Sequence, residues 1–157
     1  MIRREFVAIT LGAAAAVAQQ KPSRPDKGPP LPAELVKDFV VAAHANFEKT
    51  RNMLEQQPAL INSVWDWGGG DFETGLGGAG HMGNREIALF LLEKGARMEL
   101  FAAAMLGKLD VVKSALTAFP NLVNTPGPHG IPLIAHARKG GAEAADVLAY
   151  IESLGVQ

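Results

Sequence analysis

The chain contains an internal repeat, and this restricts its fold more than any other feature of the sequence. Residues 45–62 (ANFEKTRNMLEQQPALIN) align without a gap with residues 107–124 (GKLDVVKSALTAFPNLVN). The matched positions include apolar, proline and asparagine residues: Leu54 with Leu116, Pro58 with Pro120, Asn62 with Asn124. Such self-similarity predicts stacked supersecondary units, because one unit alone cannot bury its apolar face.

Two further copies of the repeat are visible. Residues 83–96 (GNREIALFLLEKGA) form a third copy, and a looser fourth copy begins at Gly140. Each copy carries apolar residues at helical spacing, and a shorter helical segment precedes each one: residues 35–44, 75–82, 100–106 and 133–139. The repeating unit is therefore a helix pair, and the chain is predicted to be all-α with about four such pairs.

Residues 71–96 follow a longer pattern, D-x-x-T-P-L, then A, then G-x-x-E-I, then L-L-E-x-G-A, with Gly75 in the place of the proline. This segment resembles the ankyrin repeat family, and the resemblance extends over residues 35–155. It implies an ankyrin-like helical solenoid of about four helix-turn-helix repeats, whose inter-repeat loops and inner helices form a concave recognition face. No copy keeps the family's T-P-L-H tetrapeptide, since the chain has TGLG, MELF and IPLI at these places.

The stretch GLGGAG, residues 75–80, also reads as the G-x-G-x-x-G fingerprint of a dinucleotide-binding turn. That turn requires a buried strand before it and an acidic residue about 20 residues after it. Neither is present, so the stretch is predicted to be the inner helix of the second repeat. Its glycines each cost about 1 kcal/mol relative to alanine in a helix. Close helix packing, a hollow on the concave face, and a non-helical segment all remain possible explanations.

The loops between the repeats are uneven. Leu76 and Leu100 are 24 residues apart, whereas Leu100 and Leu133 are 33 apart, so the loop near Arg97 is truncated. The first loop is extended and carries both tryptophans of the chain. Aromatic residues are enriched at interface hot spots. We therefore predict that a protein partner is bound by this finger, through Trp65, Trp67 and Phe72, unless one tryptophan covers the first repeat instead.

The repeat register places four further residues at one position late in each inner helix: His44, Met82, Leu106 and Lys139. Together with the neighbouring His81, they extend the predicted partner-binding surface onto the concave face. His44, His81, His129 and His136 fall in different repeats and lack short ligand spacing such as H-E-x-x-H. They are therefore predicted to be structural, with no metal or cofactor bound, and no catalytic set is identified.

Residues 1–18 have the order of a signal peptide, with two arginines before an apolar run that ends in Ala16-Val17-Ala18. Arg3 and Arg4 resemble the twin-arginine export motif of bacteria, although ordinary secretion is the alternative. Residues 19–33 are predicted to be a proline-rich disordered tether, and residues 34–155 the ankyrin repeat domain. Once the signal is cleaved, the protein is expected in the periplasm or outside the cell, with no membrane association.

Charge and composition narrow the function further. The net charge is −1 and cysteine is absent, which argues against nucleic-acid partners and thiolate metal sites. The sequence thus predicts a noncatalytic, exported protein-protein recognition module, with the partner and the oligomeric state left open. The alternative is an exported small-molecule or metal-binding protein that uses a glycine-lined hollow near Gly77 and His81.

Overall fold

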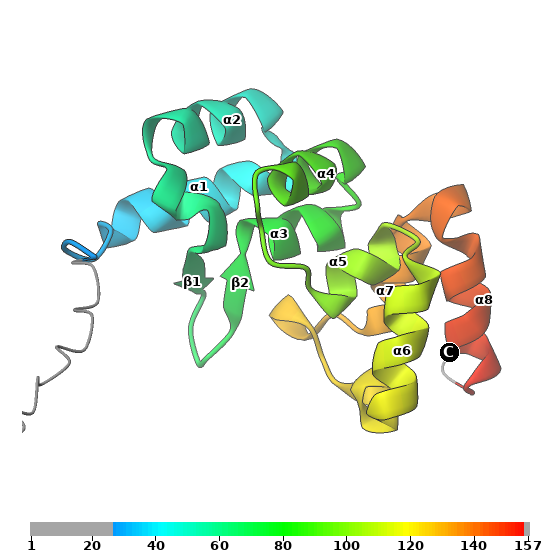
Figure 1. Ribbon diagram of the computed structural model, residues 1–157. Helices are drawn as coiled ribbons and strands as arrows, with labels where there is room; N and C mark the ends of the chain where they lie inside the picture. Colours follow the sequence, from blue (N-terminus) through cyan, green and yellow to red (C-terminus); the bar gives the residue numbers. More distant parts are fainter. Residues whose placement is uncertain (1–26, 156–157) are drawn as a thin grey trace, which may run out of the picture.

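The computed structural model describes residues 27–155, and within them the chain is mostly helical (Figure 1). The predicted signal peptide and residues 19–26 of the predicted tether lie outside the described residues. The all-α class is confirmed in outline. The described α-helices follow one another in four consecutive pairs: α1 (Ala33–Ala45) with α2 (Phe47–Gln56), α3 (Gly75–Met82) with α4 (Arg85–Glu93), α5 (Leu100–Met105) with α6 (Leu109–Ala118), and α7 (Leu133–Lys139) with α8 (Ala145–Ser153).

The first helices of the pairs pack on one another in chain order. Helix α1 contacts α3, α3 contacts α5, and α5 contacts α7, while each first helix also packs on the second helix of its own pair. Two of the aligned copies form matching elements. Helices α2 and α6 each have ten residues and are followed by five-residue 3-10 helices, η1 (Pro58–Asn62) and η2 (Pro120–Asn124). None of the helices in residues 27–155 is long and apolar enough to cross a membrane.

The apolar side chains form two buried clusters along this row of helices. The first lies among α1 to α5 and contains, among others, Phe39, Leu60, Leu76, Ile87 and Leu91. The second lies among α5 to α8 and contains, among others, Leu116, Leu133, Ile134, Val147 and Ile151. Each such side chain contributes roughly 1.5 to 3 kcal/mol when fully buried. The equivalent residues Leu54 and Leu116 are both buried, as the alignment of the repeats requires.

The glycine-rich segment is helical, which confirms the expected inner helix. Helix α3 begins after Thr74, whose hydroxyl oxygen accepts a hydrogen bond from the Gly77 amide at 2.9 Å. A Cβ at Gly75 would lie 2.9 Å from Cε1 of Phe39, so this glycine permits the close approach of α1. A Cβ at Gly80 would make only ordinary contacts with Ala102, the shortest of them 3.5 Å to its Cα. Close packing therefore explains part of the glycine content, but not all of it.

The extended loop contains a two-stranded antiparallel sheet that the sequence did not predict. Strand β1 (Val64–Asp66) pairs with β2 (Phe72–Thr74), and Trp65 lies opposite Glu73. Residues 68–70, at the turn, are glycines with positive φ. Because side chains alternate between the two faces of a strand, Trp65 and Glu73 share one face of the hairpin. Val64, Phe72 and Thr74 share the other.

The predicted residues of the finger and concave face differ in exposure. The Phe72 side chain is largely exposed, at 61%, and Met82 and Lys139 also lie at the surface. Trp65 instead packs against the first apolar cluster, which agrees with the structural alternative for one tryptophan. Leu106 is only 2% exposed, so its side chain is not available to a partner.

Candidate metal centre

Four side chains from distant parts of the sequence converge at one point beside α3. They are His44 near the end of α1, Glu73 in β2, His81 in α3, and His129 in the 3-10 helix η3 (Pro128–Gly130). One ligand atom from each residue lies within 4.8 Å of all the others. Three of the four histidines, which fall in different repeats of the sequence and lack short ligand spacing, are thus brought together in space. His136 lies outside this set, which we call the His–Glu cluster.

The distances within the His–Glu cluster are those of a small coordination shell. Nε2 of His44 lies 3.1 Å from Nε2 of His81 and 3.3 Å from Oε2 of Glu73. Nε2 of His81 lies 3.0 Å from Oε1 of Glu73, and Nε2 of His129 lies 3.3 Å from Oε2. A tetrahedral zinc site with bonds of about 2.0 to 2.1 Å has ligand-to-ligand edges of about 3.3 Å. The cluster is thus close to the size that such an ion requires.

Two of the histidines are held in place by hydrogen bonds from Nδ1, the ring nitrogen that faces away from Glu73. Nδ1 of His44 donates to the Val40 carbonyl at 2.8 Å, and Nδ1 of His129 donates to Oδ2 of Asp71 at 2.8 Å. Both partners are acceptors only, so the proton of each neutral ring is assigned to Nδ1. Their Nε2 lone pairs then face the Glu73 carboxylate, and this repulsion is relieved only by a proton or a metal cation. An outer hydrogen bond to a carbonyl or carboxylate is also the usual support of a metal-bound histidine.

Glu73 is the centre of the cluster and is fully buried. Its Oε2 accepts a hydrogen bond from Nε1 of Trp67 at 2.8 Å. Its Oε1 has no hydrogen-bond partner of good geometry, although Nε2 of His81 is close. Burial alone would raise the pKa of Glu73, but the close contacts with His44 and His81 and the hydrogen bond from Trp67 outweigh it and hold this pKa well below its usual range. The same Glu73 hydrogen bond is the main cause of the raised pKa of His44.

The glycines left unexplained by helix packing make room for the cluster. A Cβ at Gly78 would lie 2.8 Å from both Cε1 and Nδ1 of His44, so a side chain there would displace the imidazole. A Cβ at Gly77 would lie 3.3 Å from Cγ of Glu73, a tight contact. The space that Gly77 and Gly78 leave beside α3 is therefore filled by the side chains of Glu73 and His44.

His129 reaches the cluster through an unusual backbone conformation. Its φ is 58°, and it is the one non-glycine residue with positive φ between residues 27 and 155. Asp71 holds it there with both carboxylate oxygens, since Oδ1 accepts from the His129 backbone amide at 2.9 Å and Oδ2 from the ring. Strained backbone of this kind persists where the surrounding structure enforces it, and it is common at functional sites.

Trp67 covers the cluster from the hairpin side. Its ring centroid lies 5.5 Å from that of His129 and 6.2 Å from that of His44, and its indole N–H is bound to Glu73. The side chain is still partly exposed, at 38%. Trp67 thus belongs to the surroundings of the cluster, and Phe72 remains the more exposed aromatic residue of the finger.

His136 fits the structural role expected for it. It is buried in α7, its Nδ1 lies 3.1 Å from the Pro132 carbonyl oxygen, and burial lowers its pKa. Its ring contacts that of Phe101. It therefore serves as an internal comparison for the three clustered histidines.

No protein-family model matches the chain, and no curated protein matches its sequence.

Proposed function

We propose that this protein binds one divalent first-row transition metal ion through His44, Glu73, His81 and His129, without acting as an enzyme. The observation that carries the proposal is the convergence of three imidazole Nε2 atoms on a buried carboxylate, one of whose oxygens lacks a well-aligned donor. Imidazole ligands suit zinc, copper, iron and nickel, whereas calcium and magnesium prefer shells made of oxygen. The donor set thus favours a transition metal.

The number of protein ligands supports a structural role for the ion. Catalytic zinc sites keep one coordination position open for water or substrate, and structural sites fill all four positions with protein atoms. Four protein ligands are available here, and they come from α1, β2, α3 and η3. An ion at this point would connect the first two helix pairs to the segment that precedes the last pair.

Zinc titration of the full chain, after removal of bound metal, tests the proposal. We expect calorimetry to show one equivalent of Zn²⁺, while Mg²⁺ at the same concentration gives no comparable binding. His81→Gln and His129→Gln each remove one ligand and should lower zinc affinity about 100-fold or more, since residues that only support a ligand already cost about 10- to 100-fold. His136→Gln is the matched control and should keep full affinity. Absence of stoichiometric zinc binding would instead identify a proton-stabilised His–carboxylate network and overturn the proposal.

We also infer an ankyrin-like arrangement of the helix pairs and export of the mature chain. The first inference is supported by the stacking of α1, α3, α5 and α7 and by the repeat of α2–η1 in α6–η2. Cleavage after Ala18 is supported only by the sequence of residues 1–18. Intact mass of the exported protein tests it, and a mature chain that starts at Met1 would contradict it.

Recognition of a protein partner is the second candidate function, and the exposed Phe72 on the hairpin favours it. A large, mostly exposed aromatic ring on a loop is typical of interface hot spots. If Phe72 binds a partner, Phe72→Ala should lower the affinity for a stoichiometrically captured protein by about 2 kcal/mol or more. Phe119→Ala is the matched control, because Phe119 is similarly exposed, at 67%, far along the chain. Equal capture by both variants would exclude this function for Phe72.

A further inference from the structure

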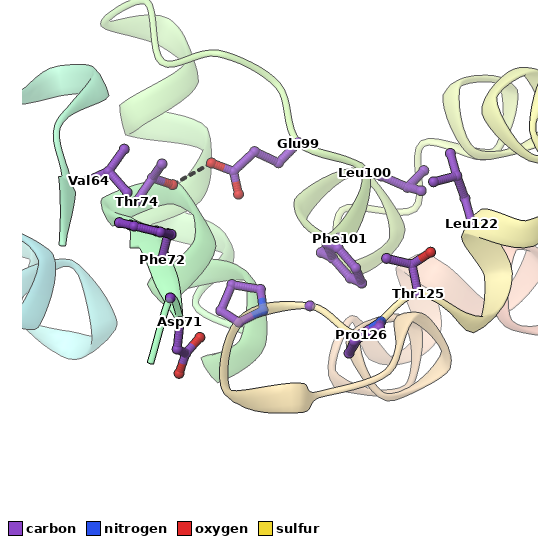
Figure 2. Close-up of a pocket in the computed structure, with 13 residues that line it drawn as sticks. Val64, Asp71, Phe72, Thr74, Glu99, Leu100, Phe101, Leu122, Thr125 and Pro126 are labelled. Carbon is purple, nitrogen blue, oxygen red and sulfur yellow. Dashed lines mark hydrogen bonds between the residues drawn. The ribbon is translucent and has the colours of Figure 1, made fainter. Parts of the chain in front are cut away.

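A cleft of about 610 Å³ lies beside the hairpin and is lined by Val64, Phe72 and Thr74 of its two strands (Figure 2). One wall is formed by the hairpin and the other by α5 and residues 122–128. Most of the lining is apolar, and its larger side chains are Val64, Phe72, Leu100, Phe101, Leu122 and Pro126. Ligand-binding clefts commonly have volumes of about 300 to 1,000 Å³ and apolar walls with a few polar groups.

The polar groups of the cleft give it a negative character. Glu99, Thr74 and Asp71 line it, and it has no lysine, arginine or histidine among its described lining residues. The carboxylate of Asp71 is already bound to His129. Glu99 accepts a hydrogen bond from the Thr74 hydroxyl through Oε1, as Figure 2 shows, but it forms no ion pair within residues 27–155. Glu99 is therefore the acid of this cleft that lacks a cation.

The surroundings of Glu99 favour a positively charged ligand. Burial raises the pKa of Glu99, and the nearby charge of Glu73 adds to this effect. The protein alone therefore stabilises the ionised carboxylate of Glu99 poorly. A cation in the cleft would supply the positive charge that stabilises it. Phe72 and Phe101 lie on the two sides of the cleft, with Glu99 between them in the view of Figure 2. Aromatic rings attract ammonium groups through their faces and pack against apolar bodies.

We propose that this cleft binds a small organic amine, with its ammonium group at Glu99 and its aromatic or alkyl body between Phe72 and Phe101. The charge of the lining selects the cation over a neutral or anionic compound of the same shape. The apolar walls of the cleft pack against the aromatic or alkyl body of the ligand. The proposal does not depend on a metal at the His–Glu cluster, since none of the four cluster residues lines the cleft.

The experiment compares three probes of similar size on the full chain: 2-phenylethylamine, the neutral 2-phenylethanol, and the anionic 3-phenylpropionate. We expect the amine to bind at least tenfold more tightly than the alcohol, and the anion to bind more weakly than both. Glu99→Gln should abolish the preference for the amine while keeping the shape of the side chain. Phe119→Ala, which alters an exposed ring outside the cleft, should leave it unchanged. Equal binding of amine and alcohol, or an undiminished preference in Glu99→Gln, would overturn the proposal.

A second measurement covers the case in which the Glu99 variant does not fold. In the wild-type protein, nuclear Overhauser contacts should connect the ring protons of the bound amine with Phe72 and Phe101. Contacts that map only to residues outside the cleft would equally overturn the proposal. All titrations are repeated with and without Zn²⁺. Because the amine preference is expected in both states, its failure is distinguishable from failure of the metal site.

Discussion

Replacement of Gly78 by alanine should favour helix α3 but disturb the His–Glu cluster, so it tests the two roles of this glycine separately. Gly78 lies within the helix and does not have a positive φ, so the backbone accepts alanine without strain. The added Cβ would lie 2.8 Å from Nδ1 and Cε1 of His44, a distance that real Cβ atoms essentially never show. The His44 ring must therefore move, and its partly exposed side chain has room to rotate toward solvent.

The expected energies follow from the contacts that change. Alanine improves helix propensity by up to about 1 kcal/mol. Displacement of the ring breaks the hydrogen bond from His44 to Val40, which costs about 0.5 to 1.5 kcal/mol. The displaced ring also loses its contact with the Glu73 carboxylate, and a hydrogen bond to a charged group contributes about 1.5 to 3 kcal/mol, so the metal-free variant should be less stable than the wild type. Loss of one ligand should weaken zinc binding by about 100-fold or more. This is at or above the largest loss seen when a residue that only hydrogen-bonds to a metal ligand is changed.

Denaturant unfolding with and without zinc measures the outcome. At a free zinc concentration 100 times the wild-type dissociation constant, the ion adds about 2.7 kcal/mol to the unfolding free energy. If affinity falls 100-fold, the same concentration adds only about 0.4 kcal/mol to the Gly78→Ala variant. Gly80→Ala is the control, since its Cβ would make only ordinary contacts with Ala102. Equal zinc stabilisation in the two variants would refute the assignment of His44 as a ligand.

Three further predictions concern pH, the support of His129, and the core. Zinc affinity should fall as pH decreases through the raised pKa of His44, because a protonated imidazole has no lone pair for the metal. The fall should begin above about pH 6.5, the ordinary pKa of histidine. Titrations from pH 8 to pH 6 check this, and constant affinity would contradict it. Asp71→Asn should lower zinc affinity about 10- to 100-fold by loosening His129, with calorimetry as the measurement and unchanged affinity as the contrary result. Leu116→Ala should lower the unfolding free energy by about 2 to 5 kcal/mol, and a loss below about 0.5 kcal/mol in denaturant unfolding would contradict its burial.

The helix pairs were predictable because the information for them is local and repeated. Apolar residues at helical spacing, in two copies that align without a gap, were enough to place α2 and α6, but not the 3-10 helices η1 and η2. The hairpin was missed because its strands have only three residues each, too few to show an alternating pattern against the surrounding glycines. Its glycines indicated a turn but not the pairing of β1 with β2.

The cluster was only partly accessible from the sequence. The repeat register placed His44 and Met82 at equivalent positions in adjacent inner helices, with His81 beside Met82. Stacking of α1 on α3 could therefore have suggested contact between the two histidines. Glu73 and His129 could not have been added in the same way. One depends on the hairpin, and the other depends on a left-handed backbone conformation that Asp71 holds from 58 positions away.

The hairpin also explains why an ion would matter at this place in the fold. An isolated two-stranded hairpin is at best marginally stable in water, and this one leaves Val64 and Phe72 exposed. It is anchored by the packing of Trp65 and by polar contacts, namely Trp67 with Glu73, Asp71 with His129, and Thr74 with Glu99. Buried carboxylates provide lasting anchors only when their charge is balanced. An ion bound to both Glu73 and His129 would balance the negative charge of Glu73. It would also join the hairpin to residues 125–131 on the other side of the cleft. The stability that it adds should therefore be largest in β1, β2 and residues 125–131, which are also the parts that shape the cleft.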